Sequence, residues 1–176
     1  TTHARAVLQC LAPIEVLDSG SKPGFPNSLI FVSGGGTAER SIRLRGPDRK
    51  PFLRLDVSLE YAIVASSNDQ GRSGFRPQIT RYFYGVQDIS GRELFAYHWH
   101  PVGASPVTTP HMHMSGIPAI TIATDERHAN SVELPFNRIH FPTHRIELAE
   151  LVRFLIVELN VSPRRQDWES VVNRFG

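Results

Sequence analysis

The sequence predicts an α+β protein in which a mainly antiparallel sheet of five to seven strands, spanning residues 28–123, carries one main helix on a face. Three stretches support this fold class. Residues 52–61 alternate between apolar and polar side chains from Leu53 onward, the pattern of a strand with one buried face. Residues 78–100 predict an aromatic hairpin, and residues 147–159 form an apolar run with a polar stripe, typical of a helix packed on a sheet.

The length and composition indicate an ordinary folded protein. A chain of 176 residues predicts a single domain over residues 1–176, and 40% hydrophobic with 20% charged residues are normal for a globular protein. The one cysteine, Cys10, excludes an intrachain disulfide and suits a reducing compartment. The chain has no signal-like start and no apolar run of membrane-spanning length, so we expect a cytoplasmic protein without membrane association.

The N-terminal region predicts one short helix followed by a first hairpin. Apolar residues at helical spacing indicate a helix over residues 4–11, which Pro13 ends because proline cannot continue the hydrogen bonding. Residues 28–32 then read as a strand and residues 33–36 as a turn. Residues 41–45, with alternating arginines, are expected to form the return strand.

The hairpin over residues 78–100 determines which side chains share a face. We expect Tyr82 to lie opposite Tyr97, in an aromatic ladder suited to the core. The other face then holds Arg81 beside His98. Because side chains alternate along a strand, a shift of two residues would keep this division between the faces, whereas a shift of one would reverse it.

The C-terminal region predicts two further short strands and two helices. Residues 111–114 and 116–123 read as extended segments. The helices are expected over residues 146–159 and 163–175, the second with Ser162 as its N-cap and a proline at its first position.

Histidines are concentrated in one part of the chain. Seven of the eight lie between His98 and His144. Two His-x-His pairs, at positions 98 and 100 and at positions 111 and 113, each place both imidazoles on one face of a strand, roughly 6.5–7 Å apart along the chain. Two such pairs on neighbouring segments can bring four imidazoles together.

One hypothesis for this cluster is acid–base chemistry on a phosphodiester such as RNA. Two histidines would exchange the proton while an arginine holds the phosphate, and no metal is required. The start of the main helix, over residues 146–159, adds cationic residues at a helix N-terminus, where a phosphate would be favoured. The catalytic candidates are His98, His100, His111 and His113, and the phosphate-binding candidates are Arg81, His144 and Arg145.

The alternative hypothesis is a non-catalytic metal- or ligand-binding module that engages a protein partner. The four residues His98, His100, His111 and His113 would then be metal ligands. Imidazole suits divalent zinc or nickel, and zinc held by three histidines can activate a water molecule. The expected register leaves no carboxylate on the histidine face, which favours the acid–base hypothesis.

Part of the chain, roughly residues 78–160, resembles the small histidine-rich TumE-type toxins of toxin–antitoxin systems. The resemblance rests on an aromatic strand, paired histidines beside prolines and a closing helix: RYFY (81–84), YHWHP (97–101), PHMH (110–113) and FPTHR (141–145). It implies a cytoplasmic toxin-like protein with an RNA-directed activity and an antitoxin-like protein partner. Whether the chain forms a homodimer stays open.

Basic residues are also concentrated between Glu39 and Arg54, where six arginines or lysines accompany two acidic residues. The formal net charge is only +2, with an isoelectric point of 9.0. Such a band is usually a solvated face. Contact with RNA or an acidic partner is the other interpretation.

Overall fold

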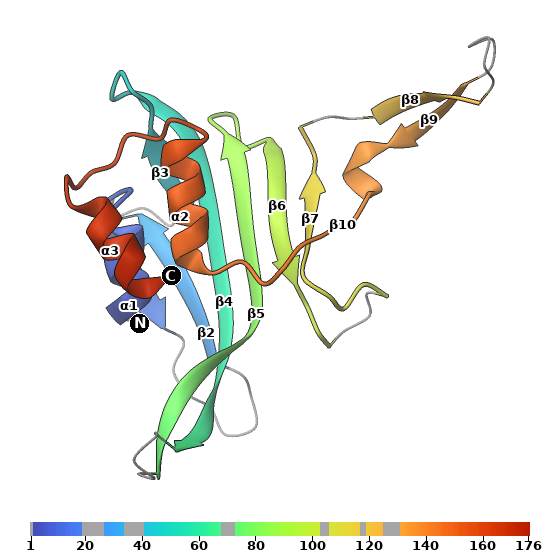
Figure 1. Cartoon of the computed structure of the whole chain (residues 1–176). Helices are drawn as coiled ribbons and strands as arrows, with labels where there is room; N and C mark the ends of the chain where they lie inside the picture. The colour runs from blue at the N-terminus through green and yellow to red at the C-terminus, as the bar shows by residue number, and fades with distance from the viewer. Residues whose placement is uncertain are drawn as a thin grey trace.

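A computed structural model describes residues 2–18, 27–33, 41–67, 73–102, 106–116, 119–124 and 131–176. Within these residues, an antiparallel sheet of eight strands has the order β1-β2-β4-β5-β6-β7-β10, with β3 also paired to β4. A separate two-stranded sheet, β8–β9, stands apart from it (Figure 1). The α+β class is therefore confirmed, with eight strands rather than five to seven. The strands are β1 (Ile14–Asp18), β2 (Asn27–Ser33), β3 (Ile42–Arg45), β4 (Pro51–Ser67), β5 (Ser73–Asp88), β6 (Glu93–Trp99), β7 (His111–Met114), β8 (Ala119–Ala123), β9 (Ser131–Pro135) and β10 (Phe141–Pro142).

The two longest strands, β4 and β5, form the centre of the sheet. Leu53, Leu55, Val57 and Leu59 are buried on one face of β4, as their alternation predicts. Both strands run beyond the predicted limits, because β4 continues to Ser67 rather than ending at residue 61 and β5 begins at Ser73 rather than at residue 78. The extra residues pair with each other in a two-stranded extension of the sheet.

The helix α2 (Leu148–Val157) covers one face of this sheet (Figure 1). It begins with a capping box in which Glu147 and Glu150 bond each other's backbone N–H groups. Its buried face meets the aromatic face of β5, where Tyr82 and Tyr84 are buried. The backbone N–H of Ile146, just before the helix, donates to the Tyr82 hydroxyl at 3.1 Å. The helices α1 (Thr2–Leu8) and α3 (Trp168–Phe175) pack beside α2.

The N-terminal strands pair differently from the prediction. Among the described residues, β2 pairs with β1 and with β4, and β3 pairs with β4, so the predicted hairpin of residues 28–45 is wrong. The predicted turn falls mainly outside the described residues. Strand β1 was not predicted, and α1 ends at Leu8 rather than at residue 11.

The β5–β6 hairpin has the predicted faces in a register shifted by two residues. Tyr82 lies opposite Trp99 and Tyr84 opposite Tyr97. The register changes where β6 carries Leu94 as one extra residue, a β-bulge next to a three-residue turn. Because the total shift is even, the aromatic residues stay on the helix-covered face and His98 stays on the other. His98 now lies opposite Phe83 instead of beside Arg81.

The C-terminal boundaries also need correction. The main sheet runs from residue 14 to residue 142, not from 28 to 123, because it includes β1 and β10. Strand β8 belongs to the separate sheet, where it pairs with the unpredicted β9. α3 begins at Trp168 rather than at residue 163, and its N-cap position is Asp167 rather than Ser162. The backbone N–H groups of Ser162 and Arg164 are used in tertiary hydrogen bonds to other segments. Within the described residues, no helix is both long and apolar enough to cross a bilayer.

Candidate metal centre

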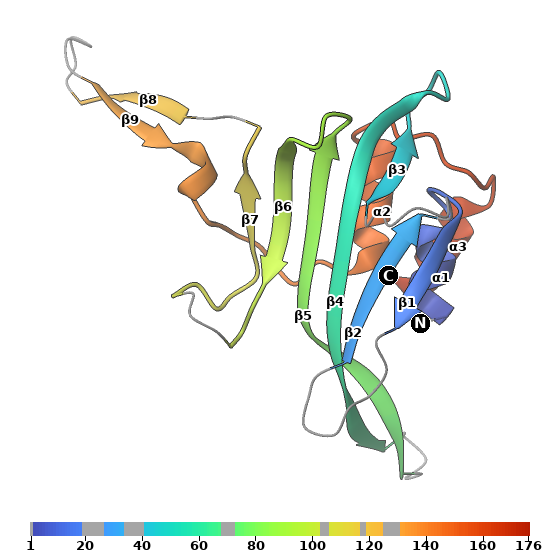
Figure 2. The same cartoon turned by 180° about the vertical axis from the view of Figure 1, so that it is seen from behind.

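Three of the four predicted histidines lie on adjacent strands and face the same side, and His100 follows directly after the end of β6. β6 pairs antiparallel with β7, with His98 directly opposite His111 and Ala96 opposite His113. Residues directly opposite each other in a sheet point to the same face, and alternate residues share it. His98, His111 and His113 therefore project from the face that the helices leave open, which Figure 2 views with the helices behind the sheet.

These three histidines are close enough to hold one metal ion. One ring nitrogen from each lies within 4.8 Å of those of the other two. The ring centroid of His98 is 5.6 Å from that of His111 and 4.9 Å from that of His113, and the ring centroids of His111 and His113 are 5.0 Å apart. The structure thus brings together three of the four residues predicted as ligands or catalysts. We call His98, His111 and His113 the histidine triad.

A fourth histidine beside the triad, His140, was not among the predicted site residues. Its ring centroid is 4.4 Å from that of His113 and 4.9 Å from that of His111. The short strand β10 pairs with β7, which places the preceding residue, His140, beside the triad. A strand of two residues has no periodicity to detect, so the only signal in the sequence was the general concentration of histidines.

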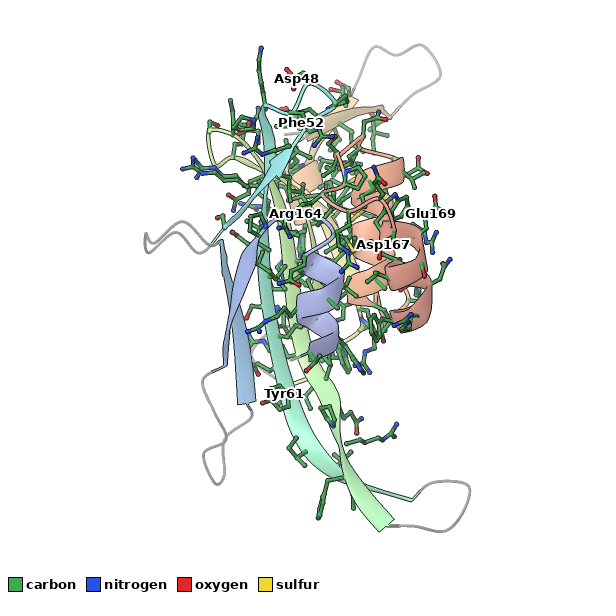
Figure 3. All side chains as sticks on the ribbon, turned by 90° about the vertical axis from the view of Figure 1, so that its left-hand side faces the viewer. Asp48, Phe52, Tyr61, Arg164, Asp167 and Glu169 are labelled. Atoms are coloured by element: carbon green, nitrogen blue, oxygen red, sulfur yellow. The ribbon has the colours of Figure 1, made fainter. Side chains whose placement is uncertain are left out.

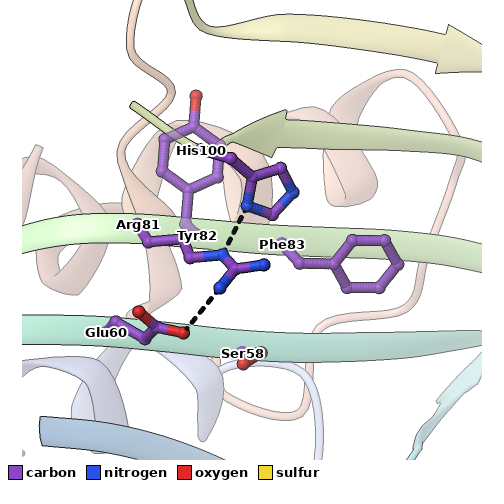
Figure 4. Close-up of a pocket in the computed structure, with 6 residues that line it drawn as sticks. All are labelled: Ser58, Glu60, Arg81, Tyr82, Phe83 and His100. Atoms are coloured by element: carbon purple, nitrogen blue, oxygen red, sulfur yellow. Dashed lines mark hydrogen bonds and ion pairs between the residues drawn. The ribbon is translucent and has the colours of Figure 1, made fainter. Parts of the chain in front are cut away.

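His100 lies at the border of the triad rather than within it. The His98 Nδ1 and His100 Nε2 atoms are 3.3 Å apart. The Arg81 Nε–H donates to the His100 Nδ1, and the Arg81 Nη1 donates to Glu60 at 3.2 Å (Figure 4). Glu60, Arg81 and His100, with Ser58, Tyr82 and Phe83, line a cavity of about 320 Å³.

Backbone carbonyl groups determine which nitrogens of two triad members are free. A carbonyl only accepts hydrogen bonds, so the Nδ1–H of His111 donates to the Thr109 carbonyl at 2.7 Å. The Nδ1–H of His113 donates to the Asn137 carbonyl at 3.3 Å. Both rings consequently present an Nε2 lone pair. Metal-binding histidines commonly have this arrangement, with the second ring nitrogen bonded to a carbonyl or carboxylate.

Burial keeps several of these imidazoles neutral. Desolvation, followed by the neighbouring histidines, lowers the pKa of His98 to about 4. Desolvation also lowers the pKa of His100 and of His113. A neutral imidazole is the form that binds a metal, and at neutral pH it is a base rather than an acid.

The predicted phosphate-binding residues are not brought together. Arg81 lies on the open face and is paired with Glu60. Arg145 lies on the helix-covered face, 4.8 Å from the centroid of the Trp99 ring, and bonds the Ile79 carbonyl. His144 is 3.1 Å from Glu150. A common phosphate site for these three residues has no support in this geometry, and the role of each stays a prediction.

A carboxylate does lie on the histidine face, contrary to the expectation from the hairpin alone. Glu60 is on β4 directly opposite Arg81 on β5, so it belongs to the same open face. Its position could not be deduced before the order of the strands was known. Through Arg81 and His100 it is connected by hydrogen bonds to His98.

Comparisons with protein-family models, curated proteins and solved structures gave no match.

Proposed function

We propose that this protein binds a divalent metal ion, zinc or nickel, through the histidine triad. The observation that carries the proposal is the convergence of three ring nitrogens within 4.8 Å. Nitrogen ligands of a tetrahedral zinc lie roughly 3.3 Å apart, a spacing that rotation of the side chains can reach. A set of imidazoles without thiolate ligands suits zinc, nickel and other late first-row metals rather than magnesium or calcium.

The second hydrogen bonds of the rings support this assignment. The Thr109 and Asn137 carbonyl groups accept the Nδ1–H of His111 and of His113, which leaves the Nε2 lone pair of each ring free for a metal ion. His140 is exposed beside the triad and is the candidate for a fourth ligand. With three histidines bound, the remaining position would hold water, and the bound metal would lower the pKa of that water for hydrolytic chemistry.

The direct test is metal analysis of untagged protein, because a histidine tag would bind nickel by itself. We expect one zinc or nickel per chain, lost in His113→Ala and retained in His144→Ala. His144 is the matched control because it lies outside the triad and pairs with Glu150. Circular dichroism verifies that both variants fold. A folded wild-type protein that takes up no stoichiometric metal would contradict the proposal.

A second candidate function is cleavage of RNA by histidine acid–base chemistry, as a toxin-like protein with an antitoxin-like partner. The contact of Arg81 with His100, next to His98, favours it, because it places a cation beside two imidazoles. The lowered pKa of His98 leaves its ring unprotonated at neutral pH, as a general base must be, although a base of pKa about 4 is weaker than one of pKa near 7; the acid must be another group.

RNA cleavage in the presence of EDTA distinguishes the two candidates. Metal-independent catalysis persists in EDTA and is abolished by His98→Ala or His113→Ala. If both variants cleave RNA at the wild-type rate, this second candidate is wrong. If cleavage requires added zinc, the activity belongs to the metal site.

A further inference from the structure

A continuous chain of hydrogen bonds leads from Glu60 to His98, a member of the histidine triad. The Arg81 Nη1 donates to Glu60 at 3.2 Å, and the Arg81 Nε–H donates to the His100 Nδ1 (Figure 4). The His100 Nε2 atom lies 3.3 Å from the His98 Nδ1. We call these contacts the Glu60–His98 chain. It lies on the open face, whereas Figure 3 shows the three helices together on the other side of the sheet.

The direction of each hydrogen bond in the Glu60–His98 chain follows from the chemistry of arginine. A guanidinium group only donates hydrogen bonds, so the His100 Nδ1 must carry a lone pair. The proton of the His100 ring is consequently on Nε2, and this N–H donates to the His98 Nδ1. The Nδ1 of His98 is therefore an acceptor, and the single proton of its ring is on Nε2.

His98 is thereby held in the opposite tautomer to the other two members of the triad. His111 and His113 carry their protons on Nδ1 and present Nε2 lone pairs. The lone pair of His98 is on Nδ1, where it accepts the N–H of His100. A metal ion needs this lone pair, so its binding must either displace His100 or change the tautomers of both rings. Either change breaks a hydrogen bond of the Glu60–His98 chain.

The sheet holds the Glu60–His98 chain in place. Glu60 is directly opposite Arg81 in the register of β4 and β5, so the backbone positions this ion pair. His98 is directly opposite Phe83, whose ring is nearly perpendicular to the imidazole, with the centroids 4.8 Å apart. The charged donor strengthens its own hydrogen bonds and polarises the next one along the chain. Breaking the chain therefore costs free energy that metal binding must exceed.

We propose that Arg81 is a positioning residue of the metal site, which acts through His100 to fix the tautomer of His98 and to compete with the metal for the His98 lone pair. This inference rests on the proposed metal-binding function. It assigns His100 to the control of the site instead of the metal coordination predicted from the sequence. Loss of His100 then strengthens zinc binding, whereas loss of a ligand weakens it.

Nitrogen-15 NMR of the imidazole rings, in EDTA, tests the tautomers without a metal. A ring nitrogen that carries a proton has a different chemical shift from one that carries a lone pair. At neutral pH we expect the proton of His98 on Nε2 and those of His111 and His113 on Nδ1. In Arg81→Met, the single tautomer of His98 should be replaced by a mixture. A wild-type His98 with its proton on Nδ1, or an unchanged tautomer in Arg81→Met, would overturn the proposal.

Zinc titration of untagged protein against a chromophoric chelator tests the competition for His98. We expect zinc to bind about tenfold more tightly in His100→Ala, because a hydrogen bond no longer has to be broken. Ser58→Ala is the matched control, since Ser58 lines the same cavity but is outside the Glu60–His98 chain, and it should retain wild-type affinity. Circular dichroism verifies that each variant folds. A zinc affinity in His100→Ala that is unchanged or weaker would overturn the proposal.

A double-mutant cycle separates the hydrogen bond of Arg81 from its charge. Arg81→Met removes a nearby cation, which by itself favours zinc. In the His100→Ala background the chain is already broken, so Arg81→Met should have less effect there than in the wild type. Equal effects in both backgrounds would overturn the proposal. If neither wild type nor His100→Ala binds zinc, the metal-binding function is wrong and the competition with it, whereas the NMR measurement still decides whether Arg81 positions His98.

Discussion

His98 shows how one residue connects the fold to the proposed metal site. The β6–β7 register places it opposite His111, and burial among other imidazoles makes its protonation unfavourable. An imidazole must be unprotonated to offer its nitrogen lone pair to a metal ion, and the lowered pKa of His98 provides this form at neutral pH. Neutral rings at pH 7 are the form that this use requires.

We expect the metal-free protein to lose stability as the pH falls from about 6.5 towards 4. In that range the unfolded chain takes up a proton at His98 that the folded chain does not, so acid favours unfolding. After allowance for the partial exposure of His98, the loss is about 1–2 kcal/mol. Urea unfolding in EDTA at several pH values measures it. His98→Gln should show a flatter dependence, and an unchanged dependence would contradict the assignment.

Zinc should bind more weakly but still stoichiometrically in His140→Ala. The triad remains complete in this variant, while the exposed fourth imidazole is lost. We expect the affinity to fall about tenfold or more, as measured by competition with a chromophoric chelator. If His140→Ala removes the metal entirely, His140 is an obligatory ligand and the triad alone is insufficient.

At the scale of elements, α2 stabilises the sheet face opposite the histidines. Leu155 is fully buried in the core, whereas Val157 on the same helix is 54% exposed. We expect Leu155→Ala to lower the free energy of unfolding by about 2–5 kcal/mol and Val157→Ala to change it by less than about 1 kcal/mol. Denaturant titration of both variants measures the difference, and similar values would mean that α2 does not pack as described.

Elements with a long, regular pattern could be predicted from the sequence. The alternation in β4 and the aromatic face of β5 and β6 gave the correct faces, and the apolar run gave α2 within two residues at each end. The register was wrong because the extra residue Leu94 leaves no pattern. The pairing of β10 with β7 was missed because a two-residue strand containing proline has no periodicity.

The same distinction applies to the candidate site. Spacing alone predicted that the His-x-His pairs share a face, and three of those four residues form the triad. Spacing could not predict His140 or Glu60, which reach this face through the pairing of β10 with β7 and of β4 with β5. Contacts between distant segments depend on strand order, which local periodicity does not contain.

At the scale of the whole molecule, the sheet separates the proposed metal site from the hydrophobic core. The histidine triad projects from the open face of β6 and β7, and α2 packs on the opposite face of the sheet. Residues without shared contacts should behave additively. Leu155→Ala should therefore leave the metal content of the folded protein unchanged, although it lowers the free energy of unfolding. Loss of metal from folded Leu155→Ala protein would indicate that the two faces are coupled.

X-ray absorption at the zinc edge, on untagged protein loaded with one equivalent of zinc, identifies the ligands of the proposed metal site. We expect three or four nitrogen ligands at about 2.0–2.1 Å, with the outer-shell scattering of imidazole rings and no sulfur. One imidazole should be lost in His113→Ala. A sulfur ligand, or a shell of oxygen atoms without imidazole, would contradict the assignment of the metal to His98, His111 and His113.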